Sequence, residues 1–146
     1  MKLVDANLLL YAVDEGSAHH VAAKRWLEQQ LSGAETFAFA WTVLLVFVRL
    51  STNARVFDAP LTAEEALDLV DSWLDQTNAT IVHPTARHGA ILRELLAPVG
   101  TAVNLVTDAH LAALSIEHGA ELCSADGDFT RFSRVRWLNP LANAGR

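Results

Sequence analysis

The sequence predicts an α/β fold with a short, mostly parallel central sheet. Three observations lead to this prediction. Short apolar segments alternate with segments of helical periodicity along the whole chain. Acidic residues follow two of the short apolar segments, and parallel sheets gather ligand-binding side chains at the carboxyl ends of their strands. The length of 146 residues suits one compact domain.

The predicted strands are short and apolar. The first ends directly at Asp5, and Asp126 and Asp128 come shortly after the fourth. In chain order we expect strands at residues 1–4, 37–39, 80–83, 121–124 and 135–137.

The predicted helices carry apolar residues at helical spacing. Thr62, with Glu65 three residues later, is expected to begin a helix with a capping box that runs to about Gln76. Gly119 is expected to end the last long helix, which begins at Thr107 or Asp108 after a loop over 104–107. The remaining helices are expected at 7–13, 18–31, 41–50 and 85–97, with one helical turn at 129–132 and a tail at 138–146. Core packing is expected for most of the four tryptophans.

The composition argues against several classes of protein. The longest apolar stretch, 37–48, is shorter than the ~20 residues that a membrane helix needs, and no signal-peptide pattern is present, so we expect a cytoplasmic protein. The single cysteine, Cys123, is expected to be a small buried side chain. The net charge of −6 disfavours general coating of nucleic acid, because affinity for phosphate comes from Lys and Arg. Action on RNA would therefore need cations held by a local carboxylate cluster.

Four aspartates are candidates for such a cluster. Each alone has a structural explanation: Asp5 and Asp108 as helix-start residues, Asp126 and Asp128 as turn residues. Together they offer oxygen ligands of the kind that Mg²⁺ and Mn²⁺ prefer, without the spacing of an EF-hand. Such ions activate water and stabilise the leaving oxygen in phosphodiester hydrolysis.

Four segments resemble PIN domains of the VapC toxin type, in the family's order and over essentially the whole chain. They are VDANLLLYA from Val4, NLVTDAHLAALSIEHGA from Asn104, LCSADGDFTRF from Leu122 and WLNPL from Trp137. The resemblance implies one three-layer α/β/α domain over residues 1–146. It also implies an endoribonuclease that depends on Mg²⁺ or Mn²⁺ and uses metal-activated water. Such a toxin of a type II toxin–antitoxin system is usually a homodimer and is inhibited by a cognate antitoxin.

The resemblance also assigns roles to residues. It makes Asp5 and Asp108 metal ligands and assigns Asp126 and Asp128 to the final acidic loop, where one or both ligate. Asn7 and Thr107 lie beside these acids in the sequence and are expected to orient them or a water molecule. One residue departs from the pattern: Val46 stands where many PIN nucleases carry Glu, which leaves the number of metal ions open.

The sequence leaves other functional interpretations open. Arg49 and the arginines 131, 134 and 136 either contact the RNA backbone or are solvated surface residues. The histidines are expected at helix ends or in packing rather than as metal ligands. A PIN fold that binds RNA or a partner without cleaving, because of Val46, is the main alternative function. A phosphotransfer enzyme with an aspartyl nucleophile is disfavoured, because Asn7 stands where the Asp-x-Asp pattern needs its second acid.

Overall fold

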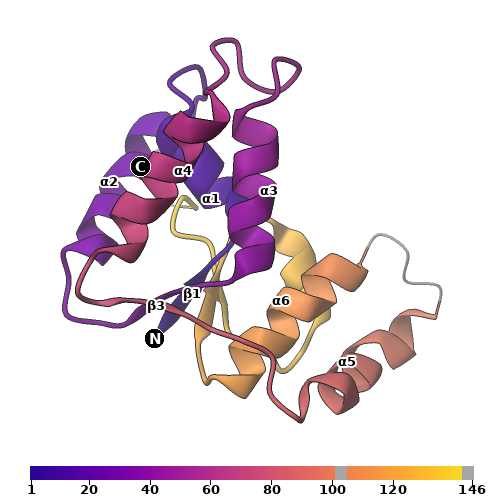
Figure 1. Ribbon diagram of the computed structural model, residues 1–146. Coiled ribbons are helices and arrows are strands. Elements are labelled where there is room, and N and C mark those ends of the chain that lie inside the picture. Colours follow the sequence, from indigo (N-terminus) through magenta and orange to yellow (C-terminus); the bar gives the residue numbers. More distant parts are fainter. Residues whose placement is uncertain (101–104, 143–146) are drawn as a thin grey trace.

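The computed structural model describes residues 1–100 and 105–142, and in this part of the chain it contains one five-stranded sheet (Figure 1). All strand pairs are parallel, and the strand order is β3-β2-β1-β4-β5, which confirms the predicted fold class. The strands are β1 (Lys2–Val4), β2 (Phe37–Phe39), β3 (Ala79–Ile81), β4 (Glu121–Cys123) and β5 (Trp137–Leu138).

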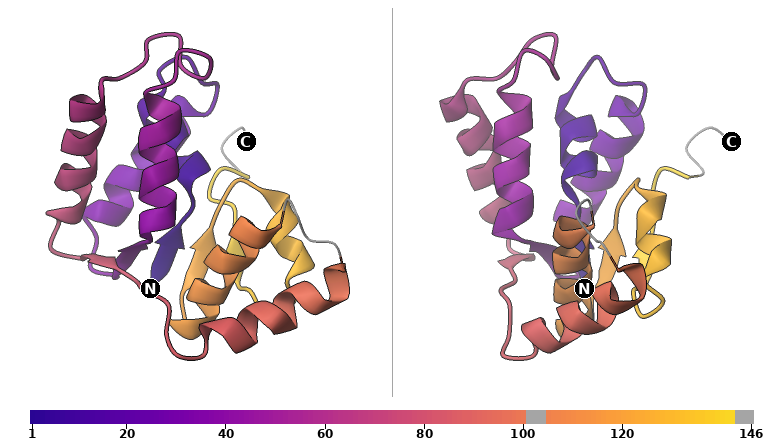
Figure 2. Two further views of the ribbon diagram at one scale, coloured as in Figure 1. Left: turned by 45° about the vertical axis from the view of Figure 1, so that its right-hand side comes forward. Right: turned by 90° about the vertical axis from the view of Figure 1, so that its right-hand side faces the viewer.

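The helices pack on both sides of this sheet and give a three-layer α/β/α arrangement (Figures 1 and 2). The helix α5 lies along α6, away from the half of the molecule that contains α1 to α4 (Figure 2). The described part of the chain contains α1 (Ala6–Val13), α2 (His20–Leu31), α3 (Trp41–Ser51), α4 (Ala63–Leu74), α5 (His88–Leu96), α6 (Val106–Glu117) and the 3₁₀ helices η1 (Ala97–Val99) and η2 (Gly127–Arg131).

The core is centred on β1, β2 and β4, whose apolar side chains are almost fully buried. Cys123 is part of this core, as expected, and burial raises the pKa of its thiol to about 12, which leaves it protonated and unreactive at neutral pH. None of the described helices has the length and apolar character required to cross a membrane.

The predicted ends of several elements need correction. The helix α6 begins at Val106, one or two residues before the predicted start, while Asn104 of the expected loop lies outside the described residues. The last strand, β5, is Trp137–Leu138 rather than 135–137. Leu141 packs into the core, so the expected tail is packed at least to that residue. The predicted capping box at Thr62 and Glu65 is confirmed, with both backbone-to-side-chain hydrogen bonds at 3.1 Å.

The expectation of core packing is wrong for one tryptophan. Trp73 is buried, but 44% of Trp41 is exposed. The core face of α3 carries Val43, Leu44 and Phe47. Trp41 and Leu45 are one turn apart and share the outward face of the helix, because residues i and i+4 lie above one another.

The strand order places the edge where a site is expected. From β1 the chain proceeds to β2 and β3 on one side of the sheet, and β4 and β5 lie on the other side. The carboxyl ends of β1 and β4 therefore meet where the strand order reverses, which is the usual place for a ligand in an open α/β sheet. Asp5 directly follows β1, and Asp126 follows β4 after two residues.

Candidate active site

Asp5 is held by hydrogen bonds to both of its carboxylate oxygens. It caps the N-terminus of α1, where its Oδ1 accepts a hydrogen bond from the Ala6 backbone N–H at 2.7 Å. Its Oδ2 accepts one from the Ser124 hydroxyl, also at 2.7 Å. Burial raises the pKa of Asp5, and the two hydrogen bonds oppose that shift because they favour the ionised form. Asp5 thus caps α1, which is the structural role that the sequence suggested for it. It also lies at the carboxyl ends of β1 and β4, where the site is expected.

Asp108 lies in the first turn of α6, as predicted, and carries a pKa raised to about 6. Burial is the largest cause, and the negative charges of Asp126, Asp5 and Asp128 add to it. The raised pKa means that burial, and after it the neighbouring negative charges, disfavour the ionised form. The four predicted acids, which lie far apart in the sequence, therefore share one electrostatic environment.

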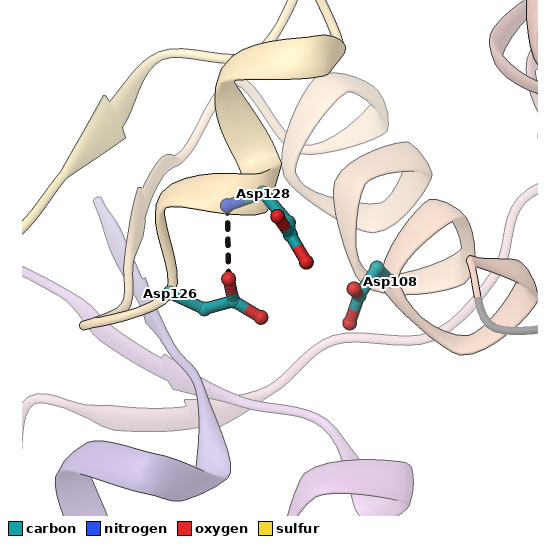
Figure 3. Close-up of side chains that lie close together, drawn as sticks. All are labelled: Asp108, Asp126 and Asp128. Carbon is teal, nitrogen blue, oxygen red and sulfur yellow. Dashed lines mark hydrogen bonds between the residues drawn. The ribbon is translucent and has the colours of Figure 1, made fainter.

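Three of these acids converge on one point (Figure 3). One carboxylate oxygen from each of Asp108, Asp126 and Asp128 lies within 4.8 Å of the other two. The Oδ1 of Asp126 accepts a hydrogen bond from the Asp128 backbone N–H at 2.8 Å, which begins η2 and fixes the turn (Figure 3). Asp5 is not one of these three and approaches the cluster from the end of β1. The donors are all oxygens, so the set suits a hard divalent cation.

Ser124 connects Asp5 to the acidic loop and was not predicted. It is fully buried, and its hydroxyl accepts hydrogen bonds from Asn7 Nδ2 at 3.1 Å and from the Asp126 backbone N–H at 3.0 Å. Both of these groups can only donate, so the single hydroxyl proton must point to Asp5 Oδ2. Asn7, expected to orient the acids, completes the contact by accepting from the Ala125 backbone N–H at 3.2 Å.

A pocket of about 170 Å³ opens beside Asp5 and Asp108. Its wall combines these two acids and two threonines with apolar side chains. The lining residues are Asp5, Ala6, Thr42, Val43, Val46, Thr107, Asp108 and Leu111. Val46, the residue that departs from the family pattern, thus lies at the site and offers it a methyl surface in place of a carboxylate.

The arginines divide into two groups. Arg131 is exposed beside the acids, with its guanidinium 3.8 Å from the Asp128 carboxylate. Arg134 pairs with Glu94 at 2.7 Å, and Arg136 donates to the Gly119 carbonyl at 2.6 Å, at the end of the sheet opposite the acids. Because β5 is parallel to β4, the connection between η2 and β5 runs back to the amino end of the sheet, and it carries these two arginines away from the cluster. Arg49 is exposed on α3 and does not line the pocket.

A second polar cluster joins α5 to α6. The Glu117 side chain is fully buried; it accepts hydrogen bonds from the Thr85 hydroxyl and from His88 Nδ1, both at 2.6 Å. His88 Nε2 lies 2.9 Å from His110 Nδ1 in a further hydrogen bond. These contacts satisfy the buried polar atoms and fasten the two helices, in line with the packing role expected for the histidines.

Comparisons with known proteins find relatives over nearly the whole chain. The sequence model of the PIN domain matches residues 2–135. Ribonuclease VapC37 of Mycobacterium tuberculosis is 53% identical over 142 residues, which are 97% of this chain and 99% of the relative. Ribonuclease VapC33 of the same species is 40% identical over 141 residues, with 97% and 99% covered.

Two solved structures share the fold. VapBC2 from Rickettsia felis, bound to a DNA fragment from its promoter, aligns with a TM-score of 0.69 at 20% identity and covers 94% of this chain and 97% of that chain. VapC20 of Mycobacterium tuberculosis, a toxin that cleaves the sarcin–ricin loop, aligns with a TM-score of 0.68 at 23% identity, with 93% and 98% covered.

Proposed function

The chain belongs to the PIN-domain family, and from this premise we propose that it is a metal-dependent endoribonuclease, the toxin of a type II toxin–antitoxin pair. The observation that carries the proposal is the convergence of Asp108, Asp126 and Asp128 at the carboxyl end of β4, with Asp5 beside them at the end of β1. The names of the ribonuclease relatives support RNA as the substrate.

The acidic residues fit a divalent cation. The donor set contains only oxygens. The raised pKa of Asp108 reflects burial and, in addition, the negative charge of the neighbouring acids, which a cation would compensate. We propose that Asp5, Asp108 and Asp126 hold Mg²⁺ or Mn²⁺, with Asp128 as a further oxygen donor. Such an ion supplies a more acidic bound water and neutralises charge on the phosphate.

The remaining residues of the site act by positioning and by charge. Ser124 and the Ala6 N–H hold Asp5 in one orientation and favour its ionised form, while Asn7 ties α1 to the loop that carries Asp126. Thr107, whose side chain carries a hydroxyl group, lines the pocket beside Asp108. Arg131, at the exposed rim, is the best placed of the arginines to contact an RNA phosphate.

The partners belong to the same proposal. We propose that the chain forms a homodimer and binds a cognate antitoxin in the cytoplasm. One of the two structural relatives, VapBC2, carries the name of a VapB–VapC pair, which supports an antitoxin partner. Apolar side chains that are partly exposed on α3, α4 and the start of α6 offer contact area; they are Trp41, Leu45, Leu67 and Val106.

A catalytically impaired RNA-binding module is the second candidate, and Val46 is the observation that favours it. Titration of Mg²⁺ or Mn²⁺ with defined single-stranded RNAs separates the two candidates. Cleavage that appears with the metal and stops with a chelator supports the enzyme, whereas retention of RNA without products supports the module.

The residue-level test is Asp5→Asn. This variant is expected to lose cleavage and toxicity while circular dichroism and thermal unfolding show an intact fold, because the amide removes charge without changing shape. Asp71→Asn, on the exposed side of α4, is the matched control and is expected to cleave like wild type. The assignment fails if purified Asp5→Asn cuts RNA at the wild-type rate.

A further inference from the structure

The lining of the pocket beside the carboxylates is chemically mixed. Asp5 and Asp108 contribute carboxylates, while Val43 and Val46 of α3 and Leu111 of α6 contribute an apolar surface, called here the apolar wall. Thr42 and Thr107, whose side chains carry hydroxyl groups, also line the pocket. A few polar groups set in an apolar surface are typical of a pocket for an organic ligand.

Asp108 separates this pocket from the point where the acids converge. On one side its carboxylate meets Asp126 and Asp128, which do not line the pocket. On the other side Asp108 lines the pocket, as Asp5 and the apolar wall do. A hydrated Mg²⁺ ion keeps several waters, and each water needs polar partners, which Val43, Val46 and Leu111 do not provide. The ion therefore belongs among the carboxylates, with Asp5, Asp108 and Asp126 as its proposed ligands, and the apolar wall is available to the substrate.

The size of the pocket limits what can occupy it. Its volume is about 170 Å³, and an apolar cavity of roughly 150 Å³ holds one benzene ring. A single six-membered aromatic ring of a nucleotide therefore fits, with its faces against methyl groups. Its polar edge would lie within reach of hydroxyl groups such as those of Thr42 and Thr107.

We propose that this pocket is a nucleobase subsite, which takes the base of one nucleotide adjoining the phosphodiester that is cut. The inference rests on the proposed function, since it identifies the part of an RNA substrate that contacts the apolar wall beside the acids. Val46 then contributes to substrate binding, because it supplies part of the surface against which the base packs. The apolar wall selects an unpaired nucleotide, because a base within a duplex cannot leave its stack without loss of pairing.

The test compares two probes that differ only by the base. Binding of cytidine 5′-monophosphate and of ribose 5-phosphate is measured by isothermal titration calorimetry with Mn²⁺ present. Wild type is expected to bind the nucleotide about tenfold more tightly, because the base and the aliphatic side chains remove apolar surface from water. Val46→Phe fills the pocket and is expected to remove this difference, and Val46→Leu, a milder filling, to reduce it.

Leu45→Phe is the matched control, because it adds the same ring to the adjacent residue of α3, which is 61% exposed and does not line the pocket. This variant is expected to keep the tenfold difference. The proposal is overturned if wild type binds both probes equally, if it shows no measurable binding of the nucleotide, or if both Val46 variants retain the full difference.

Binding of Mn²⁺ to the same samples reports separately on the proposed function. Normal Mn²⁺ binding in wild type and in Val46→Phe, together with no contribution from the base, rejects the subsite and leaves the metal-dependent nuclease standing. Absence of Mn²⁺ binding in wild type rejects the nuclease proposal itself.

Discussion

Replacement of Asp108 by Asn is expected to stabilise the metal-free protein at pH 7 while it removes metal binding. The pKa of Asp108 rises from 3.8 to about 6, a shift of about two units. At 1.36 kcal/mol per unit, this corresponds to about 3 kcal/mol of unfavourable free energy in the ionised state. Solvent screening of this partly exposed side chain reduces the figure to about 1.5 kcal/mol. Asn also loses about 0.5 kcal/mol of interaction with the helix dipole, which leaves a net gain of about 1 kcal/mol.

The effect of pH on this gain has a definite sign. The folded state of wild type holds the Asp108 proton more tightly than the unfolded state, so the penalty is absent below pH 3.8 and fully present above about pH 6. The contribution of Asp108 to the free energy of unfolding therefore falls as the pH rises through this window. Asp108→Asn carries no titrating group at this position and is expected to lose that part of the slope.

Urea unfolding with a chelator present measures the gain in free energy of unfolding and its dependence on pH. In thermal unfolding at pH 7, the midpoint temperature of Asp108→Asn is expected to lie about 2–4 °C above that of wild type. The control, Asp71→Asn, is expected to unfold like wild type at both ends of the pH window. A variant less stable than wild type at pH 7, or one with an unchanged slope between pH 4 and 6, would refute the reasoning. Mn²⁺ at 100 times its Kd is expected to stabilise wild type by about 2.7 kcal/mol and the variant hardly at all.

Three further predictions follow from the same contacts. Mn²⁺ affinity is expected to fall about tenfold from pH 7 to pH 5 in a calorimetric titration, because Asp108, with its pKa of about 6, must lose a proton to bind the ion; a flat profile would contradict this. Ser124→Ala is expected to weaken Mn²⁺ binding by about tenfold and Ser124→Thr to restore it, since both wild type and the Thr variant carry the hydroxyl that orients Asp5; equal affinities in the Ala variant and wild type would exclude that role. Thr62→Ala removes the cap of α4 and is expected to lower the free energy of unfolding by about 1 kcal/mol in urea without changing Mn²⁺ affinity.

The sequence was sufficient to predict the fold class and the edge of the sheet where the acids meet. Asp5 and Asp126 follow apolar strands. Because ligands gather at the carboxyl ends of parallel strands, this pattern alone predicts that the two acids lie near each other. The position of Asp108 could not be predicted in this way, because helical periodicity alone does not indicate which helix begins at that edge of the sheet. Its assignment depended on the resemblance to PIN domains.

The role of Ser124 could not be predicted, because a serine at the end of a strand is usually a turn residue. Its function depends on the pairing of β1 with β4, which aligns it with Asp5 across 119 positions of sequence. The available signal was a polar residue directly after a buried strand at the same edge of the sheet.

The sequence also did not predict which surface side chains face the acidic site and which face the solvent. Arg131, Arg134 and Arg136 are close in sequence, yet of these three only Arg131 lies beside the acids, because the connection before β5 returns to the opposite end of the sheet. Trp41 was misplaced for a related reason. Its neighbours in α3 are apolar nearly all round, so the pattern did not show which face the sheet would cover.

The most direct test of the metal site is Mn²⁺ binding followed by electron paramagnetic resonance. Wild type is expected to bind Mn²⁺, and Asp108→Asn and Asp126→Asn, which come from segments that only the fold brings together, are each expected to lose that binding while Asp71→Asn retains it. Undiminished Mn²⁺ binding in both site variants would contradict a shared carboxylate centre.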